Sequence, residues 1–472
     1  MIEAKQTKPA ASRWGRVLLV LVGVKVAYWA VVLTAVGLWS DFDTNRAAQI
    51  QEYWFPAGRP SEPRGEWERH FATWDAEHYL YLSAAGYAAG VRSIAFYPLW
   101  PMVIRATAAL TGLNHPLMGL VLANVCSLGG WLLFHRVTAR RLGEKLADAA
   151  LAVLVVFPGA LFFQFLYSES LFFLLLMGLW WGLERRRYGV AWGAAFLAPL
   201  ARGVGVFAVL PIGWHALSVA SPAWLGRLQA WRGRQWEKLG ARSQEPEGGR
   251  QGVEGRLASK DAGGGEKRGV RSQESGERQG STESRPTRGG SAPALPYQNV
   301  GGSATASAYR PWALLAAPLV GWGCYLALMW HWTGNPFAGL EAQKYWQVHS
   351  IGNLWDVPKF VAGFFEVSAW HEFRGSVLDR CLFILLVYTL PMIWRLGKDM
   401  AVWTYVLGIL PAMSGTFTSF TRFESCAFPL FIALAAFFTG WKRKWPLVLF
   451  IIFSATLHAV LLWRFVNFRW AG

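Results

Sequence analysis

Long apolar runs separated by polar turns make up most of the chain. A helix needs about 20 apolar residues to cross a bilayer. Runs of this kind recur along the sequence, at 14–39, 116–136, 146–164, 168–184, 188–220, 310–332, 375–395, 400–415, 425–440 and 446–465. With 188–220 split near Gly203, the pattern predicts about 11 transmembrane helices. The fold class we expect is all-α, a polytopic membrane bundle.

Basic residues set the expected orientation of these spans. Lys5, Lys8, Arg13 and Arg16 precede the first run, and cytoplasmic segments of membrane proteins carry an excess of Lys and Arg. We therefore expect a cytoplasmic N-terminus. We also expect the run 14–39 to be retained, because it is too long for the core of a signal peptide. If the spans alternate, the other dense basic clusters fall on the same side, at 136–145, 185–187, 395–398 and 442–444.

That alternation depends on the segment 94–112. It contains Pro98, Pro101 and Arg105, and charged residues inside a span are costly. We interpret it as an interfacial or re-entrant helix, because counting it as a span would move the cluster at 136–145 to the outer side. The first external loop then covers 40–112.

Composition and charge narrow the class of protein. Hydrophobic residues make up 53% of the chain and charged residues only 16%, with 28 Trp and 30 Phe, whereas soluble proteins carry about 25% charged residues. A wholly disordered chain is excluded, and a bilayer is favoured as solvent. The net charge of +17 fits cytoplasmic Lys and Arg. No basic stripe falls on a separate soluble domain, so we expect no nucleic-acid partner.

Residues 221–309 differ from the rest of the chain. They are rich in Gly, Ser, Gln, Arg and Glu, and 242–252 resembles 271–280 as an imperfect duplication. So polar a stretch cannot bury a core, and we expect a disordered cytoplasmic linker without a catalytic role. It separates an N-terminal membrane block, 1–220, from a C-terminal block, 310–472.

Ring side chains repeat at helical spacing in the first external loop. They stand at offsets i, i+4, i+7 and i+11, as Trp67, Phe71, Trp74 and His78. This spacing predicts one helix along the membrane surface with its rings at headgroup depth. Asp75 and Tyr79 share an adjacent face, since they are four residues apart. A carboxylate would then be held at the membrane boundary; an Asp75 that merely faces water is the alternative.

Four blocks of sequence occur in order along the chain. The first is W-D-A-E-H-Y-L-Y at 74–81, with G-Y at 86–87 and A-F-Y-P-L-W-P at 95–101. The second is F-P-G-A-L-F-F-Q-F-L-Y-S-E-S-L-F at 157–172. The third is G-N-P-F at 334–337, and the fourth is T-S-F-T-R-F at 418–423 with F-P-L-F at 428–431. Together they resemble the PIG-V family, whose eukaryotic members are GPI mannosyltransferase 2 enzymes and which has bacterial relatives.

The resemblance implies a membrane glycosyltransferase of the GT-C type. The Arg-, Gly- and Trp-rich composition and the short external loops favour a bacterial member. Such enzymes take a sugar, typically mannose, from a polyprenyl phosphate and use an acidic residue of the first external loop. The matching position is Asp75, with Glu77 and His78 beside it, and these are the catalytic residues we expect. The expected location is a bacterial cytoplasmic membrane with an external active site, or the endoplasmic reticulum membrane if the chain is eukaryotic.

One carboxylate suffices for this chemistry. A glycosidase needs two, because its alkoxide leaving group must be protonated, whereas a lipid phosphate leaves as a stabilised anion. Asp75 would accept the proton of the acceptor hydroxyl, and direct displacement would invert the anomeric centre. Arg202 and Arg422, both expected at outer span ends, would stabilise the departing phosphate. The alternative is that both arginines snorkel to the interface.

Further side chains are candidates for substrate binding. Glu169 follows Ser168 at the start of a run, so it either favours the positive end of a capped helix or binds acceptor hydroxyls or a divalent ion. Gln343 and Trp346 suit sugar recognition or are ordinary loop residues. The substrate-binding set we expect is Trp74, Tyr79, Tyr167, Glu169, Arg202, Gln343, Trp346 and Arg422.

No metal site is predicted from the histidines, because His331, His349 and His371 show no ligand spacing. The sequence contains no P-loop or dinucleotide fingerprint, which favours a lipid-linked donor over a sugar nucleotide. The function we expect is transfer of mannose, or another lipid-linked sugar, to a glycolipid or glycan at the outer face. The first alternative, a transporter or flippase of lipid-linked sugars, would place charges near the bilayer midplane, often with inverted repeats. The second, a non-catalytic assembly subunit, would tolerate loss of Asp75 and Arg422.

Overall fold

The computed structural model describes residues 10–55, 65, 67–220, 310–346 and 349–472. The expected linker, 221–309, lies outside these residues. Within them the regular secondary structure is helical, and the only bridge of β type joins Ala369 to Ser376. The all-α expectation is confirmed.

Four of the described helices are long and apolar enough to cross a bilayer. They are α1 (Ala10–Trp39), α6 (His115–Leu142), α16 (Val377–Leu396) and α21 (Trp445–Val466). Each coincides with a predicted span, and each is preceded or followed by a polar or glycine-containing turn. A polytopic membrane protein follows from these helices together with the shorter apolar ones.

The remaining predicted spans form shorter or interrupted helices. The run 188–220 breaks before Gly203 as predicted, because α9 ends at Ala201 and a 3-10 turn follows. The helices in these runs are α7 (Glu144–Val156), η2 (Pro158–Phe163), α8 (Glu169–Glu184), α9 (Tyr188–Ala201), η3 (Gly203–Ala208), α10 (Val209–Ala220), α12 (Arg310–Ala313), α13 (Ala316–Thr333), α17 (Lys398–Thr404), a π-helical turn (Tyr405–Ile409), α18 (Leu410–Gly415) and α20 (Phe428–Thr439).

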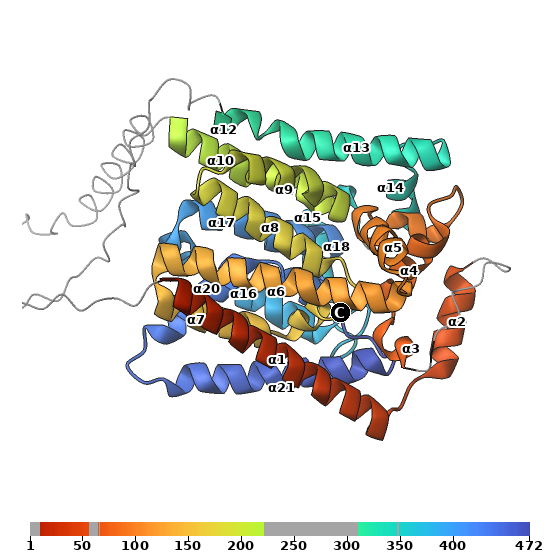
Figure 1. The fold of residues 1–472 in the computed structure, drawn as a ribbon, viewed down its shortest axis with the longest axis horizontal. Helices are drawn as coiled ribbons and strands as arrows, with labels where there is room; N and C mark the ends of the chain where they lie inside the picture. The colour runs from red at the N-terminus through yellow and green to blue at the C-terminus, as the bar shows by residue number, and fades with distance from the viewer. Residues whose placement is uncertain (1–9, 56–64, 66, 221–309, 347–348) are drawn as a thin grey trace, which may run out of the picture. The chain divides into compact units, whose positions relative to one another are not determined.

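A row of neighbouring helices forms the body of the bundle. In Figure 1, α6, α8, α9 and α13 lie side by side, and α7 and α20 pack next to them. α21 packs against α7 and the η2 turn, while α16 packs against α20. Their shared core is apolar and aromatic, with Trp131, Phe163 and Trp180 almost fully buried.

The basic clusters of the predicted cytoplasmic side meet at one end of this bundle. Arg141, at the end of α6, pairs with Glu184 at the end of α8 (3.1 Å between Nη1 and Oε1). It also binds Asp399 in α17, with 2.8 Å between Nη2 and Oδ1. These contacts bring the turns that follow α6, α8 and α16 together, as the alternating topology requires.

The other end of the bundle carries the short helices of the loops. They are α2 (Thr44–Trp54), α3 (Glu68–Phe71), α4 (Asp75–Ala85), η1 (Arg92–Ala95), α5 (Leu99–Thr111), α14 (Ala338–Ala342), η4 (Gln343–Tyr345), η5 (Ile351–Leu354), α15 (Val357–Phe365) and α19 (Phe420–Glu424). Figure 1 shows α2, α4, α5 and α14 gathered there. The predicted interfacial segment 94–112 contains α5, whose 13 residues are fewer than the roughly 20 a full crossing requires.

The prediction of one continuous helix through 67–78 is wrong. The chain forms two helices, α3 and α4, and it bends at Trp74, whose φ is 56° and ψ is −120°. A bulky residue rarely adopts a positive φ, so tertiary contacts must hold it. The indole of Trp74 stacks on Phe468, and its Nε1 donates to the Arg469 carbonyl at 3.1 Å.

The expected lipid-facing aromatic face is also not found. Residues from Ala76 to Ser83 of α4 are buried in the protein, and Phe71 is 1% exposed. Of the four rings at helical spacing, only Trp67, 44% exposed, faces outward. Phe71 and His78 therefore lie in the protein interior and not on a lipid-facing surface.

A charged side chain missed by the sequence reasoning lies inside the first spanning helix. Lys25 of α1 is buried, and its ammonium donates to Asn124, Ser127 and Gln164 at 3.0, 2.8 and 2.7 Å. It also lies 4.5 Å from the Trp131 ring centroid. A buried charge needs such partners, so this cluster ties α1 to α6 and to the residue that follows η2.

Candidate active site

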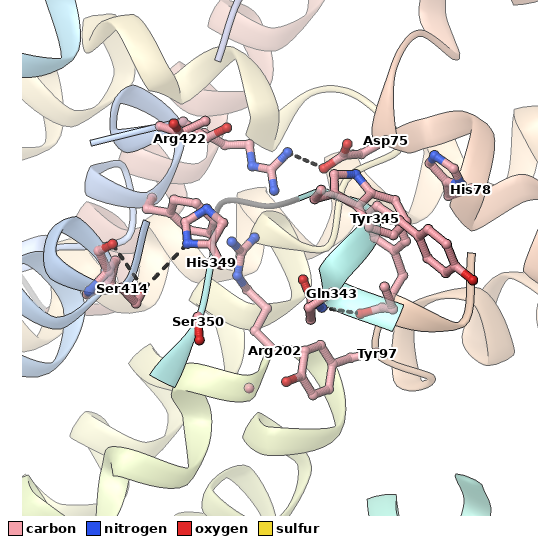
Figure 2. A pocket seen from close by; sticks show the side chains of 18 of the residues that line it. Asp75, His78, Tyr97, Arg202, Gln343, Tyr345, His349, Ser350, Ser414 and Arg422 are labelled. Atoms are coloured by element: carbon pink, nitrogen blue, oxygen red, sulfur yellow. Dashed lines mark hydrogen bonds and ion pairs between the residues drawn. The ribbon is translucent and has the colours of Figure 1, made fainter. Parts of the chain in front are cut away.

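A cavity of about 1330 Å³ opens among the loop helices. Its walls come from both membrane blocks, and they include Asp75, Arg202 and Arg422. These three residues are far apart in the sequence, and Figure 2 shows their side chains pointing into one space. The convergence required by the sequence hypothesis is therefore present, and it supplies a site with a carboxylate and two guanidinium groups.

The bend at Trp74 positions Asp75. Because the chain turns there, Asp75 becomes the first residue of α4 and its carboxylate lies at the cavity wall. One of its oxygens pairs with Nη1 of Arg422. Asp75 remains partly accessible, with a side-chain exposure of 19%, so a ligand in the cavity can reach it.

Glu169 pairs with both arginines on their buried side, away from the cavity. It is fully buried, and its Oε1 lies 2.5 Å from Nη1 of Arg202 and 2.7 Å from Nε of Arg422. Burial alone would lower the pKa of the Arg422 guanidinium, but the Asp75 and Glu169 carboxylates overcome this and raise it above its usual range. Two carboxylates and two guanidinium groups thus form one nearly neutral chain of ion pairs.

The second sequence block brings Glu169 and Arg422 together. Its η2 turn packs against α19, the helix that carries Arg422. A Cβ at Gly159 would lie 2.0 Å from the Thr421 carbonyl oxygen, so only glycine allows this approach. The F-P-G-A-L-F-F sequence therefore has a packing function next to the site.

Glu169 and Tyr167 lie behind the cavity wall. Among the described residues, the wall does not include either of them. The Tyr167 hydroxyl donates to the Thr73 carbonyl at 3.1 Å, and its ring lies 5.4 Å from Cζ of Arg422. Their geometry suits positioning of Arg422 more than direct substrate contact.

The first alternative for Glu169, a helix capped by the Ser168 side chain, is not found. That side chain makes no capping hydrogen bond, and its hydroxyl instead lies 2.9 Å from that of Tyr79. Tyr79 lines the cavity. Burial raises the pKa of the Tyr79 hydroxyl, so it remains protonated at neutral pH.

Glu77 and His78 also line the cavity. The His78 ring stacks on Phe96 with 4.8 Å between centroids, and its Nδ1 lies 2.8 Å from the Ser93 hydroxyl. Burial lowers the pKa of His78 to about 4, although the charge of Asp75 acts in the opposite direction. His78 is therefore neutral at physiological pH. Glu77 is buried and accepts a weak hydrogen bond from Gln51 at 3.4 Å.

Aromatic side chains form another part of the cavity wall. Trp346 stacks on Trp54 with centroids 4.5 Å apart, and both line the cavity. Gln343 lines it as well, and its amide donates to the Ala95 carbonyl at 2.8 Å. Aromatic faces beside amide and carboxylate groups suit sugar binding.

The sequence reasoning missed several cavity residues of the C-terminal block. His349, Ser414, Ser419 and Lys359 line the cavity. Their signal was weak, because single polar residues in loops between apolar runs are common. His349 shows no metal-ligand spacing in the sequence, and no local pattern places it in this cavity.

One group outside the cavity has the composition of a metal site. His135, Glu144 and Asp148 place their ligand atoms within 4.8 Å of one another. His135 Nε2 lies 2.7 Å from Asp148 Oδ1, so this contact already satisfies the ring nitrogen. The group lies where α6 meets α7, near the basic end of the bundle.

Comparison with known proteins agrees with the first two sequence blocks, at 74–101 and 157–172. Residues 19–239 match the family described as mannosyltransferase (PIG-V). Among curated proteins, GPI alpha-1,6-mannosyltransferase 2 of Cricetulus griseus is 30% identical over 154 residues, which is 30% of this chain and 30% of that protein. The match thus spans under a third of the relative's length, and no solved structure matches the chain. The resemblance to the PIG-V mannosyltransferase family is confirmed by residues 19–239, which carry that family's sequence pattern.

Proposed function

We propose that this protein is a membrane glycosyltransferase that moves mannose from a polyprenyl phosphate to a hydroxyl group of a glycolipid or glycan at the outer face of the membrane. The observation that carries the proposal is the cavity in which Asp75, Arg202 and Arg422 converge. The family match, to proteins described as mannosyltransferases, supports the sugar.

The ion pairs suggest how the donor would enter. Arg422 uses Nη1 for Asp75 and Nε for Glu169. An incoming phosphate would compete with Asp75 for Arg422, since guanidinium binds phosphate through paired N–H groups. The ion pair between Glu169 and Arg422 would remain on the buried side. Asp75 would then be free to accept a proton.

The reaction follows from that exchange. The acceptor oxygen attacks the anomeric carbon as Asp75 takes its proton, and the new C–O bond forms on the face opposite the phosphate. The bond between the anomeric carbon and the phosphate oxygen breaks, and its electron pair leaves with the phosphate. Arg202 and Arg422 stabilise the negative charge that develops there. The product has inverted configuration.

The direct test is transfer in reconstituted vesicles. Radiolabelled polyprenyl-phosphate mannose is supplied as donor, with a lipid extract of the source membrane as the acceptor pool and GDP-mannose in a parallel reaction. We expect label in an acceptor from the lipid donor alone. Transfer from GDP-mannose alone would contradict the lipid-linked donor. Movement of the intact lipid across the bilayer without a new glycosidic bond would favour the flippase alternative.

A further inference from the structure

His349 stands with both arginines around one aromatic ring. The Phe423 centroid lies 4.8 Å from the His349 ring centroid, 4.6 Å from Cζ of Arg202 and 5.1 Å from Cζ of Arg422. Figure 2 shows the imidazole beside the two guanidinium groups. Any ligand held by the arginines is therefore close to His349.

The hydrogen bonds of Ser414 favour one tautomer of the imidazole. The Ser414 hydroxyl donates its single hydrogen to the Pro411 carbonyl at 3.1 Å. Its oxygen can then only accept in the contact with His349 Nδ1, at 3.4 Å. In the tautomer that this arrangement favours, Nδ1 carries the proton and Nε2 carries the lone pair.

Nε2 is buried and has no hydrogen-bond partner within the part of the chain that the structure describes. Burial, reinforced by the nearby Arg422 and Arg202 charges, lowers the pKa of His349 to about 3. The ring is thus neutral, and Nε2 is an acceptor rather than a base at physiological pH. An unpaired buried acceptor costs about 1–3 kcal/mol, which a ligand donating a hydrogen bond would recover.

The position of the ring is set by the backbone beneath it. A Cβ at Gly415 would lie 2.1 Å from Cε1 of His349, so the ring rests directly on that glycine. The Ser414 carbonyl accepts from Ser350 N at 3.0 Å and from Asn353 Nδ2 at 2.6 Å. These bonds tie the loop of His349 to α18.

We infer that His349 Nε2 accepts a hydrogen bond from a hydroxyl group of the donor sugar while Arg202 and Arg422 hold the adjacent phosphate. This inference rests on the proposed function and assigns His349 as a residue that determines sugar specificity. An ionised phosphate offers no hydrogen to donate, so the donor to Nε2 must be another group of the ligand. A sugar phosphate combines the anion and the O–H donor that this arrangement fits.

The test is equilibrium binding of a short-chain polyprenyl-phosphate mannose and its monodeoxy analogues to the full-length protein. We expect the wild type to bind one deoxy analogue about tenfold more weakly than the parent, which corresponds to one lost hydrogen bond. His349→Phe should bind the parent about tenfold more weakly and should no longer distinguish it from that analogue. His349→Gln retains an acceptor and should preserve the discrimination.

Polyprenyl phosphate without sugar is the control ligand. His349→Phe should bind it as well as the wild type does, because the arginines are intact. Equal weakening for this ligand would mean a structural or phosphate-binding role and would overturn the inference. The inference would also be overturned if His349→Phe distinguished the deoxy analogues as well as the wild type does. If the wild type transfers mannose and His349→Phe still distinguishes the deoxy analogues from the parent lipid, this inference alone is contradicted. If the wild type binds no mannosyl lipid, the proposed function is contradicted as well.

Discussion

Arg422 is held from its buried side by Glu169, with 2.7 Å between Nε and Oε1. Glu169 has no exposed surface, whereas Arg422 reaches the cavity. This relationship divides the roles of the two carboxylates near Arg422. Glu169 orients the guanidinium, and Asp75 occupies the face that a substrate phosphate would claim.

Glu169→Gln should therefore weaken donor binding, although Glu169 itself does not contact the substrate. The change leaves two buried guanidinium groups with less compensating charge, and breaking a buried pair costs about 3–5 kcal/mol. We expect a lower unfolding temperature and at least a tenfold higher KM for the donor. Glu184→Gln is the matched control, because it removes a carboxylate paired with Arg141 at the opposite end. Equal effects of the two changes on donor KM would contradict the positioning role.

Arg422→Lys should cost more activity than Arg202→Lys. Arg422 binds Asp75 and Glu169 through different nitrogens, and a lysine ammonium cannot reproduce that fork. Among the described residues, Arg202 makes one such ion pair. We expect kcat/KM to fall about 10²–10³-fold for Arg422→Lys and less for Arg202→Lys. Near-normal kcat/KM in both variants would support the alternative of snorkelling side chains.

Lys25→Met tests the buried cluster in α1. Removing the ammonium leaves Asn124, Ser127 and Gln164 without their shared donor, at a cost of about 1–3 kcal/mol. We expect a lower unfolding temperature, measured by thermal denaturation in detergent. Lys442→Met, at an exposed lysine, should leave that temperature unchanged. An equally small effect of both substitutions would show that the cluster contributes nothing to stability.

Acid should destabilise the protein partly through His78. Its pKa is lowered from 6.5 to about 4 by burial, so the unfolded chain binds a proton there that the folded chain does not. The free energy of unfolding keeps its full value above about pH 6.5 and decreases as the pH falls towards 4. By about pH 5 the decrease due to His78 is roughly 2 kcal/mol.

The measurement is the fall in stability between about pH 7 and pH 5 for wild type and His78→Phe. The variant should lose less, because Phe does not titrate. His331→Phe, at an exposed histidine, should behave as wild type does. An identical fall in wild type and His78→Phe would refute the role of His78.

The apolar pattern was enough to locate the helices of both membrane blocks. Periodicity reports burial and length well, and it also placed the break before Gly203. It failed at Trp74, where the spacing of the rings predicts a continuous helix but the chain bends. The bend there depends on contacts with Phe468 and Arg469, which lie almost at the other end of the chain.

The candidate site could be predicted only in part, because its residues come from distant parts of the chain. Residue chemistry singled out Asp75, Arg202 and Arg422, and the fold brings them to one cavity. The pairing of Asp75 with Arg422 joins residues 347 positions apart, which no local pattern can specify. Placing Glu169 behind the wall, and His349 against Gly415, likewise required the packing itself.

The central claim is that Asp75 is the base of a sugar transfer in this cavity. The most direct measurement compares wild type and Asp75→Asn for transfer from radiolabelled polyprenyl-phosphate mannose, at equal amounts of protein with matched unfolding temperatures. We predict that Asn, which cannot take up the proton, lowers turnover at least about 10³-fold while donor binding persists. Turnover within a few-fold of wild type would contradict it.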